Sequence, residues 1–369
     1  MAELYLGLMS GTSMDGIDAV LIDLSGRPHI LATKYTPYDK ELRGQLITLC
    51  THNDSTVELL ASIDTSLGRL FAYAALEVLQ QAGIAADMIR AIGSHGQTIR
   101  HEPRAVSPYS LQIGNPNVIA EITGITTVAD FRRRDIAAGG EGAPLVPAFH
   151  NEVFRSSDND RVVVNIGGMA NITILPKDKD LPVSGFDTGP GNVLMDGWCE
   201  RHLGTVFDTD GQWSATGKLH NGLLEYLFKH PYINLKPPKS TGREDFNLQW
   251  LDKILEGMDH PPSPQDTQAT LCELTASSIS KAIHTHASRA HEVLVCGGGT
   301  HNRMLMQRLK THLQNRSVLS TEKFGIHPDW VESAAFAWLA KQTLAGKPGN
   351  LPSVTGAKHA VVLGGVYKA

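Results

Sequence analysis

The sequence is poor in cysteine, with only four in 369 residues, at positions 50, 199, 272 and 296. They form neither the dense framework of a disulfide-rich secreted domain nor a Cys-x-x-Cys zinc motif. The N-terminal residues show no basic segment followed by an apolar stretch, so we expect no export signal. Both absences favour a reducing compartment, and we therefore expect a cytoplasmic protein.

Long apolar runs and an excess of basic residues are also missing. No stretch approaches the roughly 18 residues that a membrane helix needs, so we expect no membrane span. The 33 Lys and Arg residues stand against 38 Asp and Glu, and the formal net charge is -5. The one basic cluster, residues 132–134, is short, which argues against a nucleic-acid partner. The histidines at 284, 286 and 291 lack a carboxylate at a familiar metal-ligand spacing, so we expect no metal there.

The residues that are present describe a globular chain, 41% hydrophobic and 19% charged, that is long enough for two domains. Apolar strands at 5–9 and 19–24 flank a turn-rich stretch and predict a β-hairpin. Residues 162–175 repeat the order of strand, glycine turn and strand, which is a weak internal repeat. We therefore predict an α/β fold of two similar halves around a central, ligand-binding cleft, with domains at residues 1–140 and 141–369.

Two helices are predicted from capping signals and apolar stripes. Ser55 and Glu58 form a capping box before an apolar stripe that Gly83 can end. A second helix should follow a proline-rich surface loop at 260–264, with Asp266 or Thr267 as its cap.

The first turn that could carry chemistry is Gly11-Thr-Ser-Met-Asp-Gly-Ile-Asp. Its glycines let the backbone approach a phosphate, its hydroxyls and N–H groups can donate to that phosphate, and Asp15 or Asp18 can hold a water bound to Mg²⁺. Taken alone, however, the stretch is more typical of a plain Asp-Gly hairpin turn.

Two further glycine turns lie in the second half. In Phe186-Asp-Thr-Gly-Pro-Gly-Asn, an aspartate leaves a strand into a turn with two glycines, so a carboxylate and free amides should face one point, which favours a functional site. Gly297-Gly-Gly-Thr follows the strand at 292–296 and would let an adenine or ribose lie against backbone. Close packing of strand on helix explains those three glycines equally well.

The fourth group combines Ser94-His-Gly-Gln-Thr, the arginines at 132–134 and Glu332. Its donors and carboxylate suit a hydroxylated, acidic substrate, although each member alone is more typical of a surface residue or a helix cap. The stretch that begins at Gly211 resembles a phosphate-binding loop but has the wrong spacing, and neither a dinucleotide motif nor a nucleophile elbow is present. The four groups together predict an ATP-dependent enzyme that acts on a polar small molecule.

As a set, these motifs resemble the anhydro-N-acetylmuramic acid kinase family within the actin, Hsp70 and sugar-kinase superfamily. The resemblance covers almost the whole chain and implies two actin-like (ribonuclease H-like) domains of mixed sheet with flanking helices. It rests on Met9-Ser-Gly-Thr-Ser-Met-Asp-Gly-Ile-Asp, Gly93-Ser-His-Gly-Gln-Thr, Gln112-Ile-Gly-Asn, Ala129-Asp-Phe-Arg-Arg-Arg-Asp, Asn165-Ile-Gly-Gly-Met-Ala-Asn, Phe186-Asp-Thr-Gly-Pro-Gly-Asn, Asp210-Gly, Cys296-Gly-Gly-Gly and Trp330-Val-Glu-Ser-Ala-Ala-Phe.

The resemblance implies that 1,6-anhydro-N-acetylmuramic acid, water and ATP give N-acetylmuramic acid 6-phosphate and ADP during recycling of the bacterial cell wall. Asp187 would be the general base, and Glu332 either a second carboxylate near the sugar or only a helix cap. His95 and Gln97, with one of Arg132 and Arg133, would hold the sugar. The implied residues for ATP are Gly11, Thr12, Ser13, Met14, Asp15, Gly16, Ile17, Asp18, Gly167, Gly168, Gly189, Gly191, Asn192, Gly297, Gly298 and Gly299, with Asp15 and Asp18 serving Mg²⁺.

Two other functions stay open at this point. One is an ordinary kinase of another open-chain or pyranose sugar, in which Asp187 would deprotonate a hydroxyl. The other is a non-enzymatic, ATP-switched protein of the same superfamily, because a fold alone does not determine function. The oligomeric state is open as well, and a homodimer is one of the options.

Overall fold

The computed structural model describes residues 2–51 and 56–369. The chain divides into two compact units, one of Met1–Val153 with Trp330–Ala369 and the other of Phe154–Asp329. These units differ from the division at residue 140 predicted from the sequence. The physical reason is long-range packing, because the end of the chain returns to the first unit and contributes the helix α12 (Val331–Leu344) to it.

The first unit is built on a six-stranded mixed sheet in the order β13-β7-β4-β1-β2-β3. Strands β1, β2 and β3 are antiparallel neighbours, β4 and β7 continue parallel to β1, and β13 is antiparallel to β7. The predicted opening hairpin is therefore confirmed. The strands are β1 (Leu4–Met9), β2 (Gly16–Asp23), β3 (His29–Pro37), β4 (Ile89–Ser94), β7 (Thr127–Ala129) and β13 (Gly365–Tyr367).

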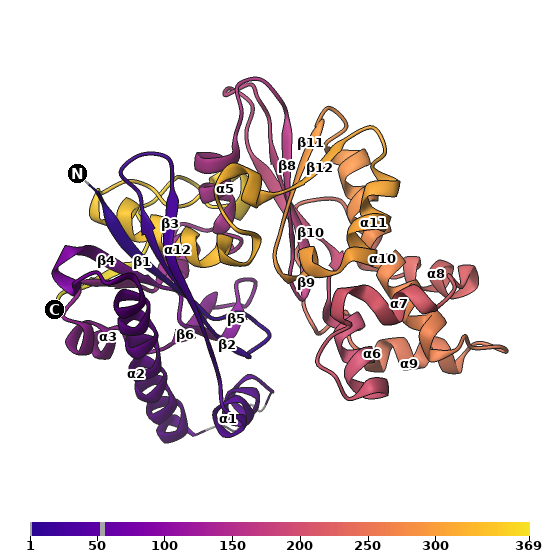
Figure 1. Ribbon diagram of the computed structural model, residues 1–369, viewed down its shortest axis with the longest axis horizontal. Coiled ribbons are helices and arrows are strands. Elements are labelled where there is room, and N and C mark those ends of the chain that lie inside the picture. Colours follow the sequence, from indigo (N-terminus) through magenta and orange to yellow (C-terminus); the bar gives the residue numbers. More distant parts are fainter. Residues whose placement is uncertain (1, 52–55) are drawn as a thin grey trace. The chain divides into compact units, whose positions relative to one another are not determined.

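Helices α2 (Val57–Ala82) and α12 cover opposite faces of this sheet (Figure 1). Leu6 and Leu8 of β1 belong to the apolar cluster that contains the buried side of α2. Side chains alternate along a strand, so Gly7 between them faces the other way, toward α12. A Cβ at Gly7 would lie 1.9 Å from the carbonyl oxygen of Ser333, so only glycine permits this close approach.

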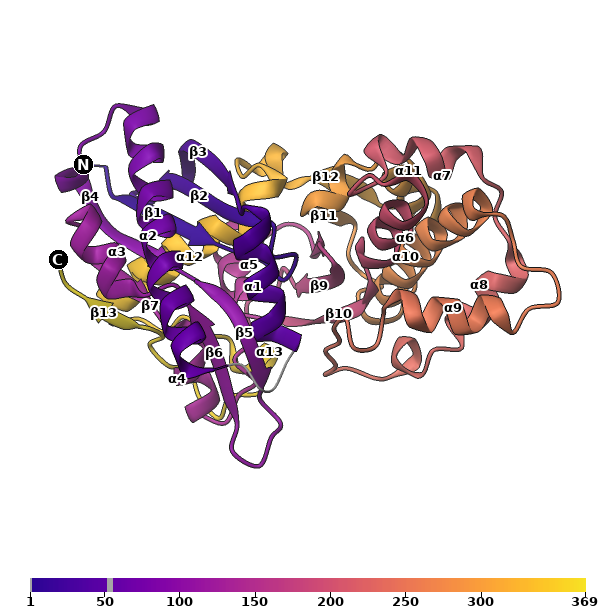
Figure 2. The same ribbon diagram turned by 90° about the horizontal axis from the view of Figure 1, so that it is seen from below.

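The ends of α2 show which capping predictions hold. Thr56 accepts a hydrogen bond of 3.1 Å from the N–H of Leu59, and Gly83 ends the helix in the left-handed region at φ 65°. The predicted end is confirmed, whereas the predicted cap Ser55 lies outside the described residues. The remaining elements of this unit are α1 (Lys40–Thr51), η1 (Ala86–Met88), β5 (Gln97–Glu102), β6 (Tyr109–Ile113), α3 (Pro116–Thr123), α4 (Phe131–Ala137), α5 (Val146–Phe154, whose last residue falls in the second unit) and α13 (Pro352–Thr355) (Figure 2).

The second unit has a five-stranded sheet in the order β10-β9-β8-β11-β12. Three antiparallel strands, β8, β9 and β10, are followed on the other side of β8 by two parallel ones, β11 and β12. This is the same arrangement as β1, β2, β3, β4 and β7, so the weak internal repeat is confirmed as a repeat of topology. The strands are β8 (Arg161–Ile166), β9 (Met169–Leu175), β10 (Ser184–Pro190), β11 (Glu292–Cys296) and β12 (Ser317–Ser320).

Helix α10 (Pro264–His286) is the long buried helix of this unit. Its cap is Ser263, whose hydroxyl accepts from the N–H of Asp266 at 3.2 Å, so the predicted cap at Asp266 or Thr267 is wrong. Proline suits the first helical position because no intrahelical partner is available there for an N–H. The other helices are α6 (Val193–Leu203), η2 (Thr209–Gly211), α7 (Gln212–Thr216), α8 (Asn221–Phe228), η3 (Pro231–Asn234), α9 (Leu248–Glu256), η4 (Gly298–His301), α11 (Arg303–His312), η5 (Thr321–Phe324) and η6 (Pro328–Trp330, whose last residue falls in the first unit).

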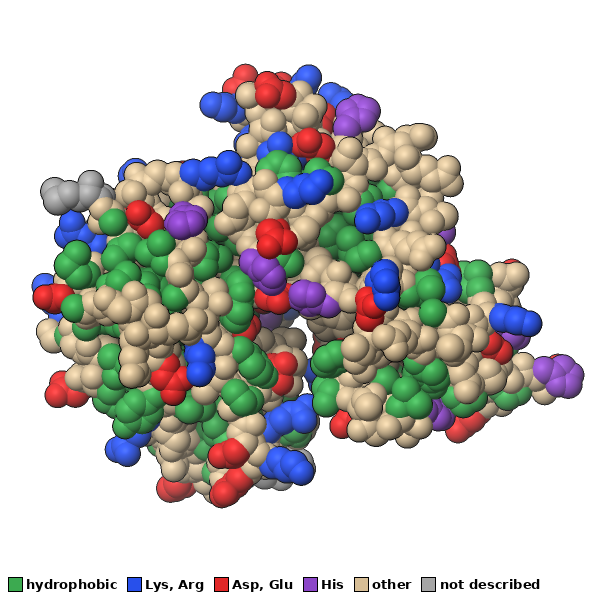
Figure 3. Space-filling view, in the orientation of Figure 1, with side chains coloured by type: hydrophobic (Ala, Val, Ile, Leu, Met, Phe, Trp, Pro, Cys, Tyr) green, Lys and Arg blue, Asp and Glu red, His purple; other side chains and the backbone are tan. Residues whose placement is uncertain are grey.

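The predicted α/β class, with mixed sheets flanked by helices, is confirmed in both units. Among the described residues, no helix has the length and apolar character needed to cross a membrane. On the face shown in Figure 3, Lys and Arg side chains are interspersed with Asp and Glu rather than gathered in one large basic patch.

Candidate active site

The turn between β1 and β2 is held in place by hydrogen bonds to the side chain of Gln97. Gln97 is only 1% exposed, and its amide accepts from the hydroxyl of Ser10 at 2.7 Å and donates to the carbonyl of Gly11 at 3.2 Å. The hydroxyl of Tyr38 donates to Ser10 at 2.9 Å. Gln97 therefore shapes the predicted phosphate hairpin, and its direct contact with a sugar stays a prediction.

The residues at the tip of this hairpin are exposed. Thr12, Ser13 and Asp15 face solvent, and the hydroxyl of Ser13 donates to Asp15 Oδ1 at 2.5 Å. Met14 has φ 51°, in the left-handed region, which is uncommon for a residue with a side chain. Asp18 is half-buried on β2. Within the described residues no group of three or more His, Cys, Asp or Glu could hold a metal ion, so protein carboxylates alone form no metal cage here.

His95, directly after β4, is buried and paired with Arg132 of α4. The Nε2 atom of His95 lies 3.1 Å from Nε and 2.9 Å from Nη2 of Arg132, and its Nδ1 lies 2.8 Å from the carbonyl oxygen of Gly96. A guanidinium only donates, so Nε2 must be the acceptor and Nδ1 must carry the proton. Burial, followed by the charge of Arg132, holds the pKa of His95 well below its ordinary value. The ring is therefore neutral at physiological pH.

Of the two arginines predicted to bind the sugar, Arg132 interacts electrostatically with Glu332. Burial lowers the pKa of Arg132 to about 10, and the charges of Glu332 and Asp135 oppose that shift. Glu332 is half-buried in the first turn of α12. Arg133 instead pairs with Asp130 Oδ1 at 3.3 Å. His95, Arg132 and Glu332 therefore form one group within the first unit. Arg133 is paired with Asp130 and does not belong to this group.

Asp187 lies in the second unit, inside β10, where the pairing with β9 shifts register between Asp187 and Gly189. The prediction that it follows the strand is therefore wrong, and a β-bulge re-aims the chain there instead. Its Oδ2 accepts from the hydroxyl of Ser240 at 2.8 Å and from the N–H of Thr241 at 3.0 Å. The hydroxyl of Tyr232 donates to its carbonyl at 2.8 Å. The side chain is thus held by two donors on one oxygen.

The glycine turn between β8 and β9 is joined to the start of α6. The N–H of Asn192 donates to the carbonyl of Gly167 at 2.8 Å, and the N–H of Gly191 donates to Gly168 at 2.9 Å. A Cβ at Gly191 would lie 2.3 Å from the carbonyl oxygen of Gly167. Gly189 has φ 144°, which favours glycine. These glycines are therefore required by packing and backbone conformation.

The remaining glycines fall into two classes. A Cβ at Gly297 would lie 2.4 Å from Asn165 Oδ1, and one at Gly299 would lie 2.3 Å from Ile166 Cγ2, so both serve close packing. A Cβ at Gly298 would meet no atom closer than Asn192 Nδ2 at 4.0 Å, and one at Gly168 would meet nothing within 4 Å. At these last two positions the missing side chain leaves open space, and a Cβ at Gly11 or Gly167 would make only ordinary contacts, at 3.7 and 3.6 Å.

Comparison with known proteins decides the family. A model of the family "Anhydro-N-acetylmuramic acid kinase" matches residues 3–369. This chain belongs to the anhydro-N-acetylmuramic acid kinase family. Relatives with that name come from Coxiella burnetii, with 50% identity over 99% of this chain and 97% of the relative, and from Saccharophagus degradans, with 48% identity over 99% of both. A third, from Thiobacillus denitrificans, is 50% identical over 100% of this chain and 98% of its own length.

Two of the solved structures with similarity to this chain are more distant than the relatives above. Component A of the (R)-2-hydroxyglutaryl-CoA dehydratase of Acidaminococcus fermentans is 13% identical with a TM-score of 0.47, covering 93% of this chain and 99% of its own. A glucokinase of the ROK family from Streptomyces griseus, in complex with glucose and AMPPNP, is 14% identical with a TM-score of 0.41, covering 92% and 99%. TM-scores below 0.5 do not by themselves establish a shared fold.

The segment at 239–241 is the part of the site that sequence reasoning missed. The ammonium of Lys239 donates to the carbonyl of Tyr232 at 3.1 Å and lies 4.5 Å from the centre of the Tyr232 ring. Burial lowers the pKa of Lys239, and the charge of Asp187 opposes that effect. The only signal in the sequence is a polar run, Ser240-Thr-Gly-Arg-Glu-Asp, which is typical of any exposed loop.

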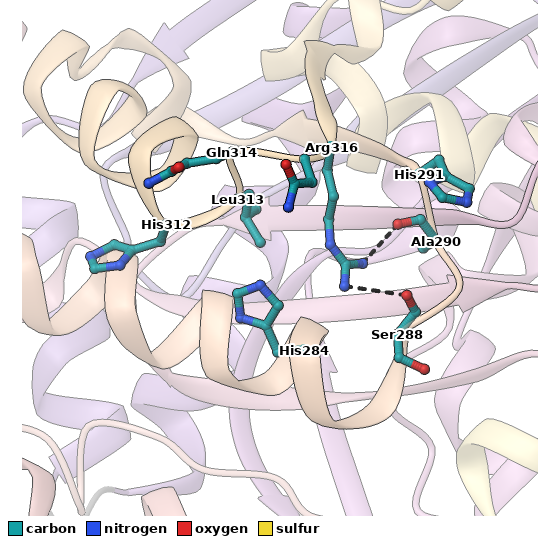
Figure 4. A pocket seen from close by; sticks show the side chains of 9 residues that line it. His284, Ser288, Ala290, His291, His312, Leu313, Gln314 and Arg316 are labelled. Carbon is teal, nitrogen blue, oxygen red and sulfur yellow. Dashed lines mark hydrogen bonds between the residues drawn. The ribbon is translucent and has the colours of Figure 1, made fainter.

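A polar cavity of about 360 Å³ lies elsewhere in the second unit, at the end of α10, and holds none of the predicted site residues (Figure 4). Its lining includes His284, His291 and Arg316. The guanidinium of Arg316 donates to the carbonyls of Ala287 and Ala290 at 2.8 and 2.7 Å. Arg316 therefore caps the end of the helix, and the cavity is a by-product of that cap rather than a second candidate site.

Proposed function

We propose that this protein uses ATP and water to open 1,6-anhydro-N-acetylmuramic acid and to phosphorylate its O6, giving N-acetylmuramic acid 6-phosphate and ADP in recycling of the cell wall. The observation that carries the proposal is the family match over residues 3–369. Identity near 50% over nearly the full length of relatives with that name supports the choice of sugar.

The chemistry assigns one base to two linked bond changes. Asp187 takes a proton from the water that attacks C1, and the bond from C1 to O6 breaks. The released O6 attacks the γ-phosphorus of ATP, and ADP leaves. The proton on Asp187 then passes to solvent, so that atoms and charge balance. The hydrogen bonds from Ser240 and Thr241 to Asp187 Oδ2 support this role, because they hold the carboxylate in its charged form.

The sugar is held by the group in the first unit. Arg132 is the better candidate than Arg133 for the lactyl carboxylate, because Arg133 is already paired with Asp130. His95 orients Arg132, and Gln97 keeps the hairpin in shape. Glu332 is the second carboxylate near the sugar or the attacking water. Its electrostatic interaction with Arg132 favours this role.

ATP is assigned to the glycine turns and to the exposed hairpin at residues 11–18. Gly168 and Gly298 fit this role because neither has atoms where a side chain would stand. Mg²⁺, when bound, would neutralise charge on the phosphates, and Asp15 and Asp18 would hold it through water. We place the reaction in the cytoplasm, a compartment where ATP is abundant and cysteines such as these four stay reduced.

One incubation separates this reaction from the two other functions. The protein is mixed with ATP and either 1,6-anhydro-N-acetylmuramic acid or its open form, and the products are identified by mass spectrometry. We expect a 6-phosphate with the mass of one added water from the anhydro sugar. Phosphorylation of the open form alone would indicate an ordinary sugar kinase, and no sugar product would indicate a nucleotide switch.

A further inference from the structure

A buried carboxylate in the first unit takes no part in the chemistry proposed above. Asp135, on α4, is 0% exposed. Its Oδ2 accepts from the N–H of Gly142 at 2.8 Å, and its Oδ1 accepts from Asn350 Nδ2 at 2.6 Å and Thr355 Oγ1 at 2.8 Å. Burying a charge is costly unless its hydrogen bonds are made, so these three donors are needed for the carboxylate to stay there.

These bonds join parts of the chain that are far apart in sequence. Gly142 belongs to the loop after α4, whereas Thr355 belongs to the C-terminal segment. The N–H of Glu141 donates to the carbonyl of Thr355 at 2.8 Å and reinforces the connection. A Cβ at Gly140 would lie 2.2 Å from Asp135 Oδ2, so the loop wraps closely around the carboxylate. The position of the loop is thus set by Asp135.

Gly142 connects Asp135 to Arg132 through its backbone. Its N–H is held by Asp135, and its carbonyl accepts from Arg132 Nη1 at 2.8 Å. The other nitrogens of Arg132, Nε and Nη2, reach His95 Nε2. These bonds use three of the five N–H groups of the guanidinium, which leaves others for a ligand. A continuous chain of contacts therefore runs from the C-terminal segment through Asp135 and Gly142 to Arg132.

We propose that Asp135 is a positioning residue for the sugar site, which fixes the guanidinium of Arg132 against His95 by holding Gly142 in place. The proposal rests on the proposed function in one respect, namely that Arg132 and His95 hold the sugar. The charge of Asp135 has a second effect, because it helps to keep Arg132 protonated against the effect of burial on its pKa.

The test is Asp135→Asn. One carboxylate oxygen becomes an NH₂ group, so at least one of the three donors then faces a donor. A displacement of about 1 Å at a binding group can reduce catalysis by about 10²-fold. We expect kcat/KM for the anhydro sugar to fall about 10- to 100-fold, mainly through KM, while KM for ATP changes by less than about twofold.

A matched control comes from the same unit. Asp64 Oδ1 accepts from the N–H of Gly114 at 2.8 Å, just as Asp135 accepts from Gly142, but it has no described contact with Arg132. Asp64→Asn should leave KM for the sugar within about twofold of the wild type. If Asp135→Asn does not fold, Thr355→Val removes one donor and should raise KM for the sugar about threefold.

The second readout is the nitrogen spectrum of His95 by NMR, assigned by its loss in His95→Gln. In the wild type Nδ1 should appear protonated and Nε2 as an acceptor, and Asp135→Asn should shift the Nε2 signal. Unchanged signals together with a KM equal to that of Asp64→Asn would overturn the proposal. A shifted signal with unchanged KM would also overturn it, by removing Arg132 from the sugar site. Failure of the proposed function itself would look different, because the wild type would not turn over the anhydro sugar.

Discussion

The hydroxyl of Ser240 donates a hydrogen bond of 2.8 Å to Oδ2 of Asp187, across 53 positions of sequence. The neighbouring N–H of Thr241 donates to the same oxygen at 3.0 Å. Two donors on one oxygen both orient the carboxylate and stabilise its charged form. The loop at 239–241 therefore fixes the carboxylate to which we assign the role of base.

Removal of the carboxylate should abolish most of the turnover. Asp187→Asn keeps the shape of the side chain but cannot accept a proton, so we expect kcat to fall by about 10²-fold or more, with KM for ATP nearly unchanged. Steady-state kinetics check this result. Asp252→Asn, in α9, is a suitable control, because both carboxylate oxygens of Asp252 accept from the guanidinium of Arg201 and Asp252 has no assigned role in the site. Near-normal turnover in Asp187→Asn would remove Asp187 from the base assignment.

Ser240→Ala should produce a milder and pH-dependent defect. Without the hydroxyl, the charged carboxylate loses one of its two donors on Oδ2 and holds a proton more strongly. The acidic limb of the profile of kcat/KM against pH should therefore move to higher pH, by up to about one unit. Ser66→Ala, which removes only a bond from Ser66 to a helix carbonyl, is the control. A limb that stays in place would show that Ser240 does not act on the base.

Alanine should have different effects at a glycine beside open space, such as Gly298, and at a tightly packed glycine, such as Gly299. Gly298→Ala should fold normally but raise KM for ATP about tenfold, because its Cβ would occupy open space at the proposed nucleotide site. Gly299→Ala should instead lower the melting temperature, because its Cβ would overlap Ile166. Thermal melts and ATP kinetics on both variants distinguish these outcomes. An unchanged KM for ATP in a folded Gly298→Ala protein would exclude this turn from the nucleotide site.

The buried His95 should make the free energy of unfolding depend on pH. Burial lowers its pKa in the fold below the unfolded value of about 6.5, so the unfolded chain binds more protons as the pH falls. The stability that the neutral ring contributes is present above pH 6.5 and is lost as the pH falls below it. We expect urea unfolding to show that His95→Gln loses less stability than the wild type between pH 8 and 5, by on the order of 1 kcal/mol. The exposed His260→Gln should not alter this loss, and equal losses in all three proteins would contradict the assignment.

The parts of the fold that local patterns specify were predictable from the sequence. The hairpin of β1 and β2 and its counterpart in β8 and β9 follow from apolar strands on either side of glycine turns. Gly83 ended its helix as predicted, because only a residue that tolerates positive φ suits that position. Proline is less informative. The sequence pattern places Pro264 in a surface loop, but Pro264 is the first residue of α10, because proline is common both in loops and at the first position of a helix.

Long-range packing was not predictable. The return of α12 to the first sheet depends on Gly7 meeting the backbone of Ser333, and no local pattern connects those positions. The contact of Ser240 with Asp187 and the pairing of Arg132 rather than Arg133 with His95 are of the same kind. The motifs identified the residue types of the site, but only the fold shows which of them meet.

The fate of the oxygen atom of water shows directly whether water attacks C1 of the sugar. The reaction is run in ¹⁸O-labelled water and followed by rapid NMR and mass spectrometry, before mutarotation mixes the anomers. O6 leaves C1 from the β face, so a water activated by Asp187 on the opposite face gives inversion. We expect ¹⁸O at C1 of an α product and none in the transferred phosphate. A β product at early time, or label in the phosphate, would contradict the coupling of ring opening to phosphoryl transfer through attack of water at C1.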